Sequence, residues 1–190
     1  MEVKSLYSTP IWTSNFPTFE KDKDLLIKII QNNIQENQIL KDIHRCEEFS
    51  SLFEYICDIT HYISDQFGFS KRKIAISSSF INSNIYDNHP NNTKIVNKNI
   101  FSGVFCIKKS NNLNHLYISN PGLNKMWLGL NLVENKNELN SENVKIDLSE
   151  GGIAIWPSYV PHFFKNDDIE NENILLSFGI MVLPENGSLL

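Results

Sequence analysis

The chain has 190 residues, of which 41% are hydrophobic and 21% charged, and its formal net charge is −5. This length allows one domain with a sizeable core, so we expect residues 1–190 to form a single domain. The acidic balance argues against nucleic acid or an anionic membrane as a partner, because neutralising phosphates requires a basic face.

The N-terminal part of the sequence predicts one strand and two helices. Residues 5–12 (SLYSTPIW) predict a short strand, which Pro10 confines to a sheet edge or a strand start. Apolar residues at helical spacing predict a helix over residues 18–38 and a second over 51–67. Gly68 stands where a glycine often ends a helix.

From Lys73 onward, apolar and small polar residues alternate, and turn clusters such as NHPNN and SEGG separate the runs. We expect strands at residues 73–86, 101–109, 115–119, 143–148, 151–158 and 172–183. Two helices followed by a series of strands predict an α+β fold with a mostly antiparallel sandwich or barrel.

Three residues stand out as candidate metal ligands. Asp87 and His89 lie two positions apart at the end of a predicted strand, and His162 follows a later one. Side chains at i and i+2 share one side of a strand, and two histidines with one carboxylate can hold Fe(II). The alternatives are that Asp87 turns the chain into Pro90 and that His162 is a core histidine.

Several segments carry a wider resemblance: SLYSTPIW, IYDNHPNN, IFSGVFCIK and GGIAIWPSYVPHFF. They resemble a bacterial and phage family of 2-oxoglutarate- and Fe(II)-dependent oxygenases over most of the chain. The family carries His-x-His-Pro, Ser-Gly-Val-Tyr-Tyr and Phe-Pro-Ser-Trp-x-x-His segments. Here the most specific pieces are Ser102-Gly103-Val104 and Trp156-Pro157-Ser158-Tyr159 with His162.

The resemblance implies a double-stranded β-helix, a jelly-roll barrel, with the two N-terminal helices packed on it. It also implies that Asp87, His89 and His162 hold Fe(II) inside the barrel. Trp156, Tyr159, Phe163 and Phe164 would form an apolar wall around the metal. Asn82 and Asn84 share a strand face by period two, so they either line the substrate pocket with Trp156 and Tyr159 or are solvated.

The chain departs from this family at both of its binding sites. Aspartate replaces the first histidine of His-x-His-Pro, and a different register would make Asn91 the third ligand. Asn173 stands where the family has the arginine that pairs with the distal carboxylate of 2-oxoglutarate. The match is placed by the segment that follows it, Ile174-Leu175-Leu176-Ser177-Phe178. We expect the cosubstrate beside Asn173, Ser177 and Lys108; Lys109 or Lys165 can supply the charge instead, although strand-end lysines are more often solvated.

The predicted function is therefore Fe(II)-dependent oxidation of a small-molecule or peptidyl substrate by O₂, with 2-oxoglutarate as cosubstrate. The alternatives are an oxygenase that needs no 2-oxoglutarate, a non-catalytic barrel, and a cupin-like protein holding zinc or manganese. Trp127 is expected in a lid or a homodimer contact. Three cysteines without a CxxC pair, and no apolar run near the ~20 residues of a membrane helix, predict a cytoplasmic protein.

Overall fold

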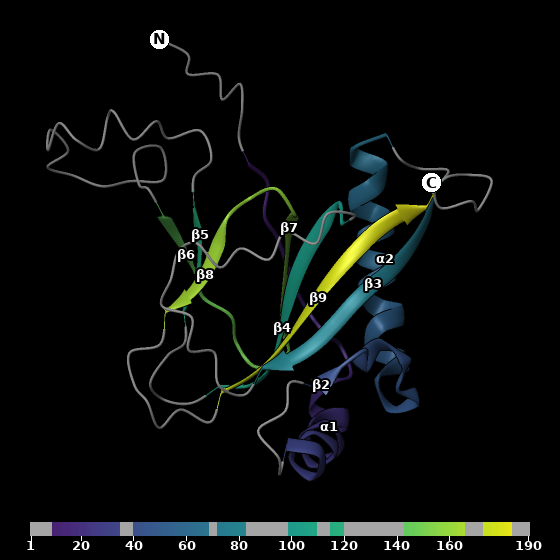
Figure 1. Ribbon diagram of the computed structural model, residues 1–190, viewed down its shortest axis with the longest axis vertical. Helices are drawn as coiled ribbons and strands as arrows, with labels where there is room; N and C mark the ends of the chain where they lie inside the picture. Colours follow the sequence, from purple (N-terminus) through teal and green to yellow (C-terminus); the bar gives the residue numbers. More distant parts are fainter. Residues whose placement is uncertain are drawn as a thin grey trace, which may run out of the picture.

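Two antiparallel sheets and two α-helices make up the computed structural model, which describes residues 9–34, 40–68, 72–82, 99–109, 115–119, 143–165 and 173–183 (Figure 1). In chain order the elements are β1 (Trp12–Asn15), α1 (Phe19–Ile34), β2 (Leu40–Lys41), η1 (Ile43–Arg45), η2 (Glu47–Phe49), α2 (Ser50–Gln66), β3 (Lys73–Asn82), β4 (Phe101–Lys108), β5 (His115–Ser119), β6 (Asn143–Ile146), β7 (Gly152–Pro157), β8 (His162–Lys165) and β9 (Ile174–Leu183). Gly68 follows α2 with a left-handed φ of 76°, as the sequence predicted.

The larger sheet has six strands in the order β1-β7-β4-β9-β3-β2. Its centre is β9, which pairs antiparallel with β3 on one side and with β4 on the other. The register between β4 and β9 shifts between Cys106 and Lys108, so that one residue of β4 has no partner on β9. This bulge interrupts the period-two alternation of β4 just before the strand ends.

Two strands differ from the sequence-based expectation. The strand expected at residues 5–12 begins only at Trp12, which pairs with Ile155 of β7, while residues 9–11 are not in a strand. No strand was predicted for His162–Lys165, yet these residues form β8 and pair with β5. Four residues that follow a proline carry too little periodicity to be recognised alone, so their pairing with β5 decides the conformation.

Both helices cover one face of the six-stranded sheet (Figure 1). Phe101, Phe105 and Ile107 of β4 project to this side and are fully buried. From α2, Leu52, Ile56 and Ile63 project from one face at helical spacing and pack into the same cluster. Burial of each such side chain contributes about 1.5–3 kcal/mol to the free energy of unfolding. Neither helix is long and apolar enough to cross a membrane.

The opposite face of the six-stranded sheet is covered by the second sheet, whose strand order is β6-β5-β8. A separate apolar cluster fills the space between the two sheets, and we refer to it as the interior cluster. Its buried members are Val104, Cys106, Leu116, Ile118, Ala154, Trp156, Val160 and Leu175, with Phe164 packed against them. The molecule therefore has three layers, namely the helices, the six-stranded sheet and the three-stranded sheet (Figure 1).

Candidate functional site

His162 lies at the start of β8, where it faces the interior cluster from the three-stranded sheet. Its ring centroid is 4.7 Å from that of Trp156, at an interplanar angle of 62°. Burial lowers the pKa of His162 below its ordinary value, while a long contact of 3.4 Å from Nδ1 to the Val160 carbonyl opposes this shift. The imidazole is therefore neutral at pH 7, which is the form that binds metals.

Trp156 supplies a second polar group to the same region. Its side chain is only 1% exposed. Its Nε1 has no hydrogen-bond acceptor within the described part of the chain. Because buried indole N–H groups usually find an acceptor, an oxygen from elsewhere in the chain or from a ligand would satisfy this one.

The other two predicted ligands, Asp87 and His89, lie outside the described residues, as do Asn84 and the alternative ligand Asn91. The segment that carries them follows Asn82, the last residue of β3, whose backbone pairs with Leu175 of the interior cluster. Within the described ranges, no group of three potential ligands surrounds a metal position.

The predicted cosubstrate residues lie on β4, on β9 and immediately before β9. Asn173, immediately before β9, is 4% exposed. Lys108 ends β4 and pairs with Ile174, and Ser177 of β9 pairs with Val104. Both Lys108 and Ser177 are partly buried, so the structure brings the three predicted residues to two adjacent strands.

A small cavity of about 10 Å³ lies between the two sheets at this end of the interior cluster. It is lined by Cys106, Lys109, Leu116, Ile146, Leu148, Phe164, Asn173 and Leu175. The lysine that lines it is Lys109, which the sequence analysis named beside Lys108. Space of this size holds about one water-sized group.

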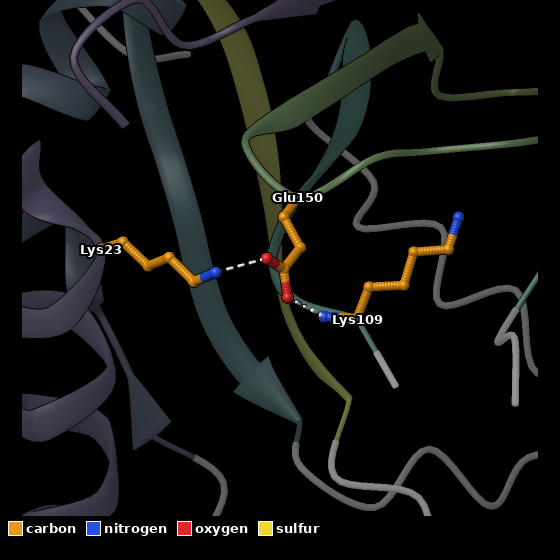
Figure 2. Close-up of polar contacts among 3 residues, drawn as sticks. All are labelled: Lys23, Lys109 and Glu150. Carbon is orange, nitrogen blue, oxygen red and sulfur yellow. Dashed lines mark hydrogen bonds and ion pairs between the residues drawn. The ribbon is translucent and has the colours of Figure 1, made fainter. Parts of the chain in front are cut away.

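Lys109 is held in place by a polar network that spans three parts of the chain (Figure 2). Its backbone N–H donates to Oε1 of Glu150 at 2.8 Å, and Oε2 of Glu150 pairs with Nζ of Lys23 at 2.5 Å. Its own Nζ donates to the Leu148 carbonyl at 2.8 Å. No sequence pattern indicated this network, because Glu150 and Lys23 are 127 positions apart.

The expected apolar wall is only partly formed. Trp156 and Phe164 belong to the interior, whereas Tyr159 is 63% exposed in the turn after β7. Phe163 stacks on Tyr117 of β5, with ring centroids 5.1 Å apart and an interplanar angle of 7°. This difference follows from strand alternation, since His162 and Phe164 face the interior and the residue between them faces away.

His115, at the start of β5, is buried but lies outside the interior cluster. Its Nδ1 is 3.2 Å from Oδ1 of Asp147, and its ring contacts Tyr117 edge to face. It is therefore a cross-strand histidine and provides a matched control for His162.

No protein-family model and no curated protein matches the chain. Solved structures do match it. A Pseudomonas putida prolyl-4-hydroxylase shares 11% identity over 92% of this chain and 93% of that chain, with a TM-score of 0.54. A Burkholderia pseudomallei oxidoreductase of the 2OG-Fe(II) oxygenase family shares 13% identity over 83% and 76% of the two chains, with a TM-score of 0.53.

HygX from Streptomyces hygroscopicus, solved with nickel and 2-oxoglutarate bound, shares 7% identity over 91% of this chain and 82% of that chain, with a TM-score of 0.55. At such identities the likeness concerns the fold. The chain thus has the α+β, double-stranded β-helix fold of the 2-oxoglutarate- and Fe(II)-dependent oxygenases, which confirms the predicted fold class.

Proposed function

We propose that the protein is a non-haem Fe(II)-dependent oxygenase that oxidises a small-molecule or peptidyl substrate with O₂ and uses 2-oxoglutarate as cosubstrate. The observation that carries this proposal is the neutral imidazole of His162, which faces the interior between the two sheets of an oxygenase fold.

The chemistry of the donor set fits Fe(II). His162 supplies one imidazole from β8, and we assign the remaining imidazole and the carboxylate to His89 and Asp87. Two histidines and one carboxylate leave open positions on an octahedral metal. Bound iron would supply the redox chemistry that couples oxidation of the substrate to conversion of 2-oxoglutarate into succinate and CO₂.

The residues around His162 orient its ring, exclude water and keep the imidazole neutral. Trp156 restricts the orientation of the imidazole ring, because its indole edge packs against the ring from the opposite sheet. Phe164 and Leu116 keep water away from the interior, and the Trp156 N–H, which has no acceptor among the described residues, can donate to an oxygen there. The apolar lining also keeps His162 neutral by making its protonated form unfavourable.

A second function of a different class is a barrel that has the fold without the catalysis. Asn173 in place of an arginine and the small size of the cavity favour this alternative. An intermediate alternative is an oxygenase that takes its electrons from the substrate and needs no 2-oxoglutarate.

Anaerobic titration of the purified protein with Fe(II), followed by 2-oxoglutarate under visible spectroscopy, separates these functions. We expect one Fe(II) per chain and a metal-to-ligand charge-transfer band on addition of 2-oxoglutarate. His162→Ala and Asp87→Ala should abolish both signals, and His115→Ala should keep them. Iron binding without the band would indicate an oxygenase that needs no 2-oxoglutarate, and absence of iron binding would support the non-catalytic barrel.

A further inference from the structure

Trp156 carries a polar group that packing alone does not require. It lies on β7, where it pairs with Ser102 of β4, and its side chain belongs to the interior cluster. The oxygenase family that the sequence resembles has phenylalanine at this position of its Phe-Pro-Ser segment. A phenylalanine ring fills an apolar interior without any polar atom, so the indole N–H of this chain is an addition that the core does not need.

The described residues around Trp156 offer its N–H no acceptor. Nε1 is buried and has no hydrogen-bond partner among them. The hydroxyl groups of Ser102 and Ser158 are 2.8 Å apart and bond to each other. The other buried members of the interior cluster are aliphatic, apart from the thiol of Cys106, which lies four residues along β4 from Ser102. A buried N–H without an acceptor destabilises the folded protein, and a ligand that brings an oxygen atom removes this cost.

The unsatisfied N–H shares its part of the interior with the imidazole of His162. The two ring centroids are 4.7 Å apart, at an interplanar angle of 62°. Nδ1 of His162 faces the Val160 carbonyl at 3.4 Å, which leaves Nε2 for a metal ion. A ligand that binds the metal beside His162 is therefore brought to the region of the indole.

Oxygen ligands and nitrogen ligands of a metal differ in what they offer to this N–H. A carboxylate oxygen that is bound to a metal keeps lone pairs that accept a hydrogen bond. Free imidazole has no lone pair left once it is coordinated, because its second nitrogen carries a proton. Hydrogen bonds with an ionised partner are also stronger than those between neutral groups, so a carboxylate gains most from the indole.

From these contacts we propose that the indole N–H of Trp156 donates a hydrogen bond to an oxygen atom of the ligand bound beside His162, and thereby selects carboxylate ligands over nitrogen ligands. The inference deepens the proposed function, on which it rests, by assigning a ligand-selecting role to a residue that is not one of the proposed metal ligands.

Formate and free imidazole test this role as ligands of the protein loaded with Co(II), without any turnover. The visible absorption of Co(II) reports the binding of each. We expect Trp156→Phe to retain Co(II), because phenylalanine keeps an aromatic ring in the interior. It should bind formate about 10-fold more weakly than the wild type, the loss that one hydrogen bond to a charged group predicts, and imidazole as tightly as the wild type.

Trp12→Phe is the matched control. The Nε1 of Trp12 donates to Oε1 of Gln66 at 3.3 Å, and its side chain packs on the helix side of the six-stranded sheet. The control loses an indole N–H far from His162, so it should bind both formate and imidazole as the wild type does.

Two kinds of failure are distinguishable. If Trp156→Phe binds formate as tightly as the wild type, or loses affinity for both probes to the same extent, Trp156 does not select the ligand, although the oxygenase proposal stands. If the wild type binds no Co(II), the metal site fails and the inference falls with it. Should Trp156→Phe not fold, the indole N–H signal of Trp156 in nuclear magnetic resonance spectra of the Zn(II)-loaded wild type decides. Formate should move this signal downfield and leave that of Trp12 in place, and an unmoved Trp156 signal would overturn the proposal.

Discussion

Trp156 and His162 contact each other across the interior of the molecule, with ring centroids 4.7 Å apart. The indole comes from β7 of the six-stranded sheet and the imidazole from β8 of the three-stranded sheet. This contact joins the two sheets at the position of the proposed metal ligand. The orientation of His162 therefore depends on a side chain that is itself no ligand.

Replacement of Trp156 should weaken metal binding through this contact. Trp156→Leu leaves the imidazole in place but frees its ring, so we expect Mn(II) affinity to fall about 10-fold, as for other residues that orient metal ligands. Trp12→Leu is the control, because Trp12 packs on the helix side against Phe67 and Phe101. Equal Mn(II) affinities of the two folded variants, measured by electron paramagnetic resonance, would refute an orienting role for Trp156.

Two glycines with the same backbone conformation should differ in their tolerance of alanine. Gly68 and Gly151 have φ values of 76° and 77°. A Cβ at Gly68 meets nothing within 4 Å, whereas one at Gly151 would lie 2.7 Å from the ring of Phe19. Gly68→Ala should cost about 1–2 kcal/mol of unfolding free energy for the left-handed backbone, and Gly151→Ala should cost about 1–3 kcal/mol more because Phe19 must move. Urea denaturation of both variants measures the difference, and equal losses would contradict the steric argument.

The charge of Glu150 should make a pH-dependent contribution to stability. Desolvation by burial raises its pKa, but the hydrogen bond from the Lys109 backbone and the pairing with Lys23 outweigh it, so the folded-state pKa lies below the unfolded value of 4.5. A depressed carboxyl pKa stabilises the fold above the unfolded pKa, and this stabilisation is lost as the pH falls through the folded pKa. Because the pair is partly exposed, we expect only about 0.5–1 kcal/mol.

Glu150→Gln keeps an acceptor for the Lys109 N–H and removes the charge. Its deficit in unfolding free energy relative to the wild type should be present at pH 6 and should disappear near pH 3, as measured by urea denaturation at each pH. Glu54→Gln, which removes an exposed carboxylate of α2, should show no comparable deficit at pH 6. A deficit of Glu150→Gln that stays constant from pH 6 to pH 3 would show that charge is not its cause.

Phe105 should be the aromatic residue on which docking of α1 most depends. It is fully buried, and its ring contacts Phe16 and Phe19 edge to face at centroid distances of 6.0 Å and 5.7 Å. Phe105→Ala should cost about 3–5 kcal/mol of unfolding free energy. Phe67→Ala, at a position that is 44% exposed, should cost clearly less. Comparable losses in thermal or urea denaturation would contradict this ranking.

The sequence by itself determined the α+β class and the position of most elements. The apolar residues of α2 recur at helical spacing, and those of β4 alternate between two buried faces, because these periods are properties of the backbone. His162 was predicted as a metal ligand from its place among aromatic residues after a strand and from the family resemblance, and that role stays a prediction.

The tertiary structure alone decided which residues share a face where the alternation breaks. The bulge between Cys106 and Lys108 leaves Ile107 without a partner on β9 and shifts the alternation of β4, so that Lys109 lines the cavity between the sheets. In the same way, β8 exists because it pairs with β5, and Glu150 meets Lys23 from a distance of 127 positions. Such features depend on contacts between distant segments, whereas periodicity within a segment reports only its own conformation.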